Sequence, residues 1–444
     1  MKQVDVGRLL DEGQWGGYQK WLICLTALAI VFDGIDNQLL GVAIPSIMGE
    51  WSVPRTAFAP VVSLGYAGMM AGGALAGLAG DRFGRRTALL GSMVVFGAMT
   101  AVAAAASGPG QLAVFRLLAG IGLGGAIPNA TALAAEYVPL RHRPVAVTLT
   151  IVCVPLGATI AGLLGVRALP VVGWRLLFVI GGVVPVLSAL LLLRALPESP
   201  RYLARHPNRW DELKMTLARM GHPTAPGATF ADSSEQTSAR TSILSLFQPE
   251  LRADTVALFA AFFSCLLAVY LGFSWLTALL TGAGFDPATA NIGITAFNLG
   301  GVVGALAGSV AIGGMGSRVP MLSMTVGAAA GAIALSAMQI DSSQPVLPIL
   351  VMLTLTGGLI NAVQTTMYAL AAHVYPGAVR ATGIGTASAV GRLGAILSGY
   401  AGAWAIDYRG SGSYFSLIAV AMAATFVSLA LVKRHVPRRG SNTD

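Results

Sequence analysis

Twelve continuous apolar runs dominate the sequence and constrain its fold more than any other feature. A helix of about 20 apolar residues spans the hydrocarbon core of a bilayer. The runs do not alternate with polar residues, so they predict helices rather than the strands of an outer-membrane barrel. Charged residues make up 11% of the chain, against about 25% in soluble domains. The sequence therefore predicts an all-α membrane protein. The twelve predicted spans are 21–44, 57–79, 87–106, 111–134, 145–166, 174–195, 254–280, 289–312, 319–338, 346–371, 381–405 and 413–432.

A polar stretch, residues 196–253, divides the twelve spans into two sets of six. Its first part predicts a short amphipathic helix near 210–220, and the Pro, Gly, Ser and Thr that follow predict a flexible linker. We therefore expect an N-terminal six-helix bundle at 1–195, a linker loop at 196–253 and a C-terminal six-helix bundle at 254–444.

The two halves also carry matching residues at a constant offset of 237 positions. "AAEYVPLRHRPVAVTLTIVCVPLGATIAG" at 134–162 aligns with "AAHVYPGAVRATGIGTASAVGRLGAILSG" at 371–399, and Arg143 falls opposite Arg380. Both stretches run from the end of the fourth helix of a half through its fifth. Two parallel six-helix repeats with a site between them near the midplane are typical of secondary transporters.

The distribution of Lys and Arg predicts the orientation. Alternating sides along the chain places 22 of them on the side that holds both termini and the 196–253 loop. Four lie on the other side, at Arg55, Arg167, Arg175 and Arg409. Lys and Arg are concentrated in cytoplasmic loops, so both termini are expected inside the cell, and the net charge of +9 reflects topology rather than nucleic-acid binding. The polar N-terminus, of mixed charge, does not resemble a cleavable signal peptide.

Two carboxylates, Asp33 and Asp36, interrupt the first span in "ALAIVFDGIDNQLLGVAIPSI". Each ionised carboxylate in hydrocarbon costs roughly 2.5–3.5 kcal/mol on insertion scales. Because they are three residues apart, they share one helix face, which should look into the bundle or a water-filled cavity. Carboxylates so placed can load and release protons, so we predict that Asp33 and Asp36 form a proton-coupling pair. The alternative is a permanent structural ion pair with Arg116.

Two arginines lie within the spans, and a carboxylate substrate would need such a cation. Arg116 opens the fourth span, where it could instead snorkel to the edge of the membrane as an anchor. Arg392 lies mid-helix in "AVGRLGAIL", where its planar guanidinium could grip a carboxylate with two parallel hydrogen bonds. It could equally be the partner of Asp33 or Asp36, so which arginine binds substrate stays open.

Polar and aromatic residues near the middle of other spans are candidates for contacts to a substituted ring. Aromatic side chains stack on a ring, and amides or hydroxyls bond its substituents. Each could instead join helices to one another. The candidate residues are Asn129, Tyr270, Trp275, Asn298, Gln364 and Tyr368.

The loop after the second span reads "GLAGDRFGRRTALL", which resembles the loop signature of the major facilitator superfamily. Asp81 could accept hydrogen bonds from a helix N-terminus or from an arginine of the other half, and so latch the inward face. The equivalent loop of the second half has Ser317 at the position of the acid, so the latch is expected to be asymmetric. The candidate gating residues in this loop are Gly77, Asp81, Arg82, Gly84, Arg85 and Arg86.

Further stretches resemble the aromatic acid:proton symporter family of that superfamily, and within it the 4-hydroxybenzoate/protocatechuate transporter type. They are "DGIDNQLLGVAIPSI", "FRLLAGIGLGGAIPNATALAAEYVP", "PESPRYL" and "YPGAVRATGIGTASAVGRLGAI". The resemblance implies the major facilitator fold and import of a small aromatic carboxylate, such as a hydroxybenzoate, with protons across a bacterial inner membrane. It places the family's helix 1 acids at Asp33 and Asp36, its helix 4 arginine at Arg116 and the acid that ends helix 4 at Glu136. Glu136, Arg143 and Arg380 complete the predicted gating set.

An exporter, an antiporter or a transporter of another small solute on the same fold remains the alternative function. Sugar porters share "PESPR" but usually repeat a related motif after the last helix, where this chain reads "LVKRHVPRRGSNTD". Drug:proton antiporters usually have a Gly-Pro pair in the fifth helix, which reads "VCVPLGATIAGLLG" here. No nucleophile and base, CxxC pair or metal-ligand set is evident, so we expect no enzyme activity, cofactor or metal, and a monomer.

Overall fold

The computed structural model describes residues 3–225, 227–232, 243–376 and 379–438. In this part of the chain, eleven helices are long and apolar enough to cross a membrane. The last, α14, spans Arg380–Leu431 but is broken at Arg409 and Gly410, where the backbone leaves the helical conformation. Its two limbs bring the spanning segments to the twelve that the hydrophobic pattern predicts. The prediction of an all-helical, multi-pass membrane protein is confirmed.

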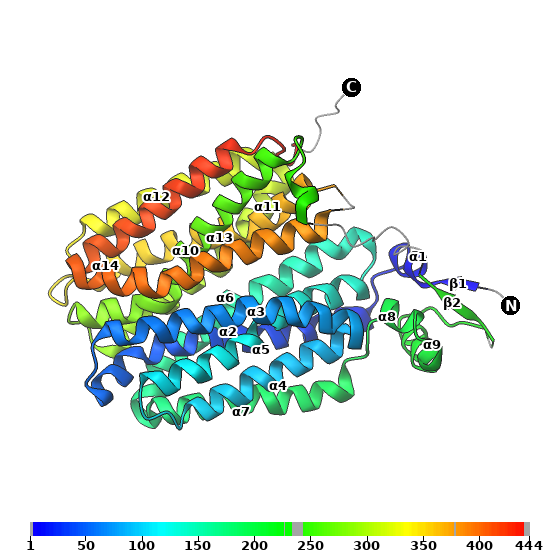
Figure 1. Cartoon of the computed structure of the whole chain (residues 1–444), viewed down its shortest axis with the longest axis horizontal. Helices are drawn as coiled ribbons and strands as arrows, with labels where there is room; N and C mark the ends of the chain where they lie inside the picture. Colours follow the sequence, from blue (N-terminus) through cyan, green and yellow to red (C-terminus); the bar gives the residue numbers. More distant parts are fainter. Residues whose placement is uncertain (1–2, 226, 233–242, 377–378, 439–444) are drawn as a thin grey trace.

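The spanning helices form two groups on either side of the 196–253 stretch. The first group is α2 (Gly17–Trp51), α3 (Ala59–Phe83), α4 (Arg85–Ala103), α5 (Pro109–Tyr137), α6 (Arg143–Arg167) and α7 (Leu169–Ala195). The second is α10 (Arg252–Gly282), α11 (Pro287–Met315), α12 (Arg318–Ala337), α13 (Val346–Val374) and α14. Figure 1 shows the groups as two bundles lying side by side. They meet where α2, α3 and α6 contact α10, α14 and α11 respectively. The domain boundaries at 195 and 254 stay a prediction.

Glycines allow the helices of the first bundle to pack backbone to backbone. A Cβ on Gly72 of α3 would lie 2.0 Å from the carbonyl oxygen of Ile121 on α5. A Cβ on Gly34 of α2, between the two acids, would lie 2.2 Å from the carbonyl oxygen of Val154 on α6. No side chain fits at either position. Small residues at helix interfaces are a general means of holding membrane helices together.

Two breaks in spanning helices lie at glycines with positive φ. Gly173 in α7 has φ 71° and ψ 169°, and Gly410 in α14 has φ 61° and ψ −136°. Glycine adopts this region without the steric cost of a Cβ. The break at Gly173 explains why the apolar pattern predicts a span from 174, whereas the helix begins at Leu169.

Short elements gather beyond one end of the bundles. They are β1 (Gln3–Asp5), α1 (Val6–Asp11), η2 (Leu140–His142), α8 (Pro200–Ala204), η3 (Pro207–Arg209), α9 (Trp210–Arg219), β2 (Thr229–Ala231) and η5 (Ile243–Phe247). We call this the α9 end and the opposite end, where η1 (Arg55–Phe58) and the break in α14 lie, the η1 end (Figure 1).

The 196–253 stretch holds more structure than its composition predicts. α9 confirms the amphipathic helix expected near 210–220. β2 pairs in parallel with β1, which ties the stretch to the N-terminus of the chain. Strands of three residues are too short to show a period-2 pattern, so the sequence did not predict them. Part of the predicted flexible linker, residues 226 and 233–242, lies outside the described residues.

Candidate functional site

Asp36 forms a buried ion pair inside the first bundle. Its side chain is 0% exposed, and its Oδ2 lies 3.3 Å from Nη1 of Arg116 on α5. Thr100 on α4 donates a hydrogen bond to Oδ1 of the same carboxylate. Arg116 is therefore buried within the protein, and its guanidinium does not extend into solvent. Because each charge has a partner, this arrangement repays part of the cost of burying both.

Asp33 is equally buried but has a different environment. Neither of its carboxylate oxygens has a hydrogen-bond partner in the part of the chain that the structure describes. The charges that act on it are those of Asp36, one turn away, and of Arg392 on α14 of the other bundle. An ionised group with so little compensation is costly in a low-dielectric interior. Asp33 is thus the less compensated acid of the pair, and its role in proton exchange stays a prediction.

Arg392 reaches across the interface between the bundles. Its Nη1 donates to the carbonyl oxygen of Met69 on α3, at 2.6 Å. This is the one hydrogen bond of its guanidinium to the described residues, so most of its five donors remain available to a ligand. Arg116, by contrast, is engaged by Asp36. The arrangement makes Arg392 the better candidate for a bidentate carboxylate contact.

Aromatic side chains lie next to these charges on both sides of the interface. The rings of Tyr66 on α3 and Tyr270 on α10 are 4.4 Å apart between centroids. The Tyr66 hydroxyl also lies 2.7 Å from Oγ of Ser274 on α10. Two rings from opposite bundles provide a surface on which an aromatic ligand can stack.

A buried amide forms a second bridge between the bundles. Nε2 of Gln38 on α2 donates to the carbonyl oxygen of Phe273 at 2.8 Å. Asn298 on α11 donates to Oε1 of Gln38 at 3.1 Å. Asn298, a predicted substrate contact, therefore serves here as a link between α2 and α11.

The cavity at this interface is too small for an aromatic acid. It is lined by residues of both bundles, among them Asn37, Tyr66, Arg116 and Ser274, and has a volume of about 10 Å³. That volume is close to the minimum for one water molecule. Binding of a larger ligand requires the bundles to separate.

The structure gives packing contacts to two other predicted substrate residues. The Trp275 ring is fully buried within the second bundle, where its Nε1 donates to the carbonyl oxygen of Ser398 at 3.1 Å. The Asn129 amide donates to carbonyl oxygens of Ala76 and Gly125 and so joins α3 to α5. Neither side chain lines the interface cavity.

Gln364 and Tyr368 lie together on α13 and are half-buried. The Tyr368 ring contacts Phe262 edge-on, with 5.2 Å between centroids, and its hydroxyl lies 3.4 Å from Oγ of Ser388. The Gln364 side chain makes no hydrogen bond to any residue that the structure describes. Their role as substrate contacts stays a prediction.

Several hydrogen bonds that involve side chains join the spanning helices of the two bundles. Among the described residues, these bonds lie in the half of the bundles nearer the η1 end. On the first bundle they come from the η1-proximal part of α2 and α3, namely Gln38, Ser63, Tyr66 and the Met69 carbonyl. At the η1 end, Nη1 of Arg55 pairs with Asp407 at 2.8 Å, and Arg55 also donates to the Ala278 carbonyl. The bundles are thus fastened at the η1 end.

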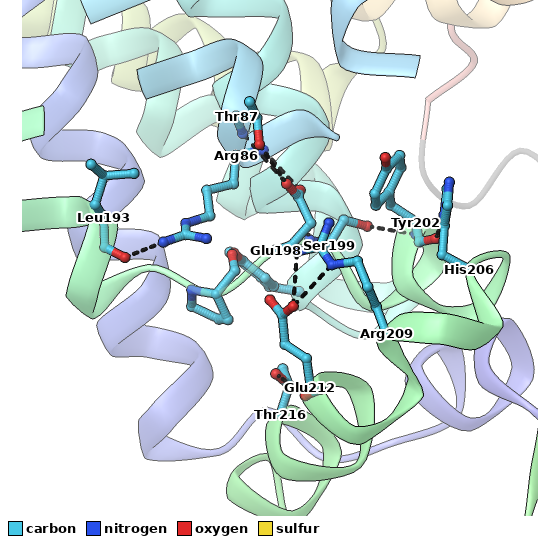
Figure 2. Close-up of polar contacts among 12 residues, drawn as sticks. Arg86, Thr87, Leu193, Glu198, Ser199, Tyr202, His206, Arg209, Glu212 and Thr216 are labelled. Carbon is cyan, nitrogen blue, oxygen red and sulfur yellow. Dashed lines mark hydrogen bonds and ion pairs between the residues drawn. The ribbon is translucent and has the colours of Figure 1, made fainter. Parts of the chain in front are cut away.

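At the α9 end, Glu198 of "PESPRYL" organises the loop between α3 and α4. Its buried carboxylate accepts hydrogen bonds from the backbone N–H groups of Arg86 and Thr87 at the start of α4, as Figure 2 shows. A carboxylate there is stabilised by the helix dipole. Gly84 has φ +101°, and a Cβ on it would lie 2.2 Å from Glu198 Oε2. Arg86 donates to the Leu193 carbonyl and holds α7 to the same loop.

The remaining predicted gating acids pair within the first bundle. Asp81 lies 2.7 Å from Nη2 of Arg85, and Nε of Arg85 lies 3.8 Å from Glu136. Ser199 donates a hydrogen bond to Glu136. Asp81 therefore has a partner on its own loop, and its ion pair does not reach the second bundle in this conformation. Its role as a latch stays a prediction.

Arg143 and Arg380 occupy matching positions in the two halves. Nε of Arg143 donates to the carbonyl oxygen of Ala135, and Nε of Arg380 to that of Tyr375, at the end of the preceding spanning helix in each case. Arg143 also pairs with Asp11 of α1, which Arg201 shares at 2.7 Å. Ser317 has a different role from Asp81, because its hydroxyl lies 3.0 Å from Nδ1 of His435 and anchors the C-terminal segment.

Several residues in or near the candidate site were absent from the sequence predictions. They are Asn37, Gln38, Tyr66, Ser274 and Thr100. Asn37 and Gln38 directly follow Asp36, so polar side chains in an apolar span were the signal that could have identified them. In the described part of the chain, no group of three His, Cys, Asp or Glu could hold a metal ion.

Comparison with known proteins identifies the family of this chain. A family model described as "Major Facilitator Superfamily" matches residues 26–367 and 257–444. A "Gallate transporter" of Pseudomonas putida is 34% identical over 403 residues, which are 90% of this chain and 88% of the relative. The "4-hydroxybenzoate transporter PcaK" of Acinetobacter baylyi is 35% identical, with 90% and 88% covered.

Among solved structures, an inward-open conformation of the xylose transporter XylE from E. coli superposes with a TM-score of 0.75 at 17% identity. The match covers 96% of this chain and 98% of the other. At this identity, the likeness concerns the fold.

Proposed function

Because the chain belongs to the Major Facilitator Superfamily, we propose that it is a proton-coupled symporter that imports a small aromatic carboxylate, such as a hydroxybenzoate. Its family makes it a membrane transporter rather than an enzyme, and it is related to transporters of aromatic acids. The finer assignments, which are the substrate, the proton coupling, the direction and the membrane, are our proposal.

One observation carries the coupling: the carboxylate of Asp33 is fully buried with no hydrogen-bond partner among the described residues, and Arg392 of the opposite bundle reaches across the interface to the Met69 carbonyl. An ionised Asp33 attracts the guanidinium, whereas a protonated one does not. A substrate carboxylate can therefore form an ion pair with Arg392 when Asp33 carries a proton. Substrate and proton are then bound together, which is the requirement for symport.

The interface residues suggest how the rest of the substrate is held. Tyr66 and Tyr270 supply stacking surfaces, while Gln364 and Tyr368 supply polar groups for ring substituents. The names of the gallate and 4-hydroxybenzoate transporters support a hydroxylated aromatic acid.

Opening and closing would use the contacts at the two ends. The Arg55–Asp407 pair and the α2 and α3 hydrogen bonds would break when the η1 end opens. The loop at the α9 end, with Asp81, Arg85 and Glu136, would engage when that end closes. In our orientation the α9 end is cytoplasmic, so the structure has its site closed toward the outside.

Uptake into proteoliposomes tests the function. With the lumen alkaline relative to the bath, labelled 4-hydroxybenzoate should accumulate above its external concentration, and a protonophore should abolish the accumulation. Unlabelled benzoate, protocatechuate and gallate, added in turn, should rank the substrates by competition. The proposal fails if none of these acids accumulates, and accumulation only when the lumen is acidic relative to the bath would indicate an antiporter.

Cysteine labelling tests the orientation in a bacterial inner membrane. In a variant without the three native cysteines, Arg219→Cys on α9 should resist a membrane-impermeant maleimide in intact cells. Ser342→Cys, in the loop between α12 and α13, should react. Both side chains are exposed in the structure, so access depends on the side of the membrane. Labelling of position 219 from outside would reverse the assignment.

A further inference from the structure

An apolar groove runs along the second bundle, away from the interface with the first. It lies between α10 and both limbs of α14 and has a volume of about 520 Å³. Phe259, Phe263 and Val420 are among its lining residues. Ala424 and Ser428, which have small side chains, also line it. The groove is cut into spanning helices, so it lies at the depth of the lipid acyl chains.

The two serines in the groove present no free polar group to a ligand. Ser264 Oγ donates to the carbonyl oxygen of Ala260 at 2.8 Å and lies 2.9 Å from Oγ1 of Thr425. Ser428 Oγ donates to the carbonyl oxygen of Ala424 at 2.8 Å. A hydrocarbon chain can therefore occupy the groove without breaking the hydrogen bonds of these hydroxyl groups.

Two exposed cations lie at the α9 end of this groove. Arg252 lies one helical turn before Val256, a groove residue on the same face of α10. Lys433 lies two residues beyond the end of α14, and its backbone N–H donates to Asp254 at 2.6 Å, which places it beside the start of α10. Neither side chain has an ion-pair partner in residues 3–225, 227–232, 243–376 or 379–438. The nearby Asp254 is taken by Arg434, 3.8 Å away.

We propose that this groove binds an anionic phospholipid, with an acyl chain between α10 and α14 and the phosphate at Arg252 and Lys433. The apolar groove and the unpaired cations are separate features that meet at one place, and a phospholipid matches both. Basic sites beside membrane helices are known to favour anionic head groups. A second copy of this chain fits less well, because a two-fold contact there would bring the cations of both copies together.

Native mass spectrometry of the full-length protein in neutral detergent tests the site. Phosphatidylglycerol and phosphatidylcholine of the same acyl composition are titrated separately. Wild type should retain one phosphatidylglycerol molecule in preference to phosphatidylcholine. In Arg252→Gln/Lys433→Gln this preference should fall by about 5-fold per cation, roughly 25-fold in all, given about 1 kcal/mol per basic residue near a membrane surface.

Two further variants separate the head group from the chain. Arg141→Gln/Arg194→Gln removes two exposed cations at the α9 end of the first bundle, and it should bind as wild type does. Ala424→Phe fills the groove from an exposed position, so it should weaken retention of both lipids. Equal wild-type binding of the two lipids, an unchanged Arg252→Gln/Lys433→Gln variant, or a dimer in place of bound lipid would overturn the proposal.

Discussion

Asp33→Asn is expected to abolish accumulation of substrate against its gradient while leaving the protein folded. The amide preserves the size of the side chain but cannot carry the coupled proton. Because Asp33 has no hydrogen-bond partner among the described residues, its replacement leaves no cation newly unpaired. Substrate exchange between the two sides of a proteoliposome should persist, since exchange needs no net proton movement. The measurement is pH-driven uptake beside counterflow in the same vesicles.

Asp36→Asn is the informative control, because it alters a carboxylate three residues away on the same helix. Here the change leaves Arg116 buried without its counter-charge. Breaking a buried ion pair typically costs about 3–5 kcal/mol. We therefore expect Asp36→Asn to lower thermal stability in detergent and to reduce all transport modes together. Normal accumulation by Asp33→Asn would remove Asp33 from the coupling mechanism, whatever Asp36→Asn does.

The helices could be predicted because a helix in the hydrocarbon of a bilayer needs a continuous apolar run, which is visible in the sequence alone. A span must be apolar over about 20 residues wherever it lies in the bundle, so the twelve spans could be predicted without knowing their neighbours. The last two could not be recognised as one helix with a break, because Gly410 looks like any loop glycine in the sequence. The β1–β2 pair joins residues more than 220 positions apart, and nothing local predicts such a pairing.

Site residues could be predicted from the sequence only where a charged side chain lies in an apolar helix, because burying a charge there costs free energy. The charges Asp33, Asp36, Arg116 and Arg392 stand out in apolar helices, and all four are buried or half-buried near one another or across the interface. Neutral residues give weaker signals, because an amide or aromatic ring serves packing as readily as binding. Trp275 was predicted as a substrate contact and packs inside one bundle in this structure, whereas Gln38 was not singled out and bridges the two bundles.

The sequence also could not assign partners to the charges. Either arginine could have paired with either acid, and helix spacing alone does not rank them. The choice follows from helix packing, since α5 contacts α2 within the first bundle and α14 approaches from the second. As a result Arg116 is held by Asp36, and Arg392 of α14 bonds to the Met69 carbonyl of the other bundle.

Arg392→Ala is expected to reduce kcat/KM for the aromatic acid by roughly 30-fold to 5,000-fold, from a loss of about 2–5 kcal/mol when a buried charge partner is removed. A carboxylate that enters the bundle loses its hydration and needs a fixed cation. Arg392→Lys keeps the charge but not the planar fork, so it should raise the apparent KM by about tenfold, the value of one hydrogen bond to a charged group. Initial rates of uptake over a range of substrate concentrations measure both effects.

Arg409→Ala is the matched control, because Arg409 lies in the same helix but is exposed at the η1 end. Its uptake kinetics should equal those of wild type. The substrate provides a second test, since 4-hydroxybenzamide keeps the ring and hydroxyl and removes the negative charge. The amide should compete poorly with 4-hydroxybenzoate, because it leaves the guanidinium of Arg392 without a counter-charge. If the amide competes as well as the acid, Arg392 does not read a carboxylate, and a sugar or drug transporter on this fold becomes the better assignment.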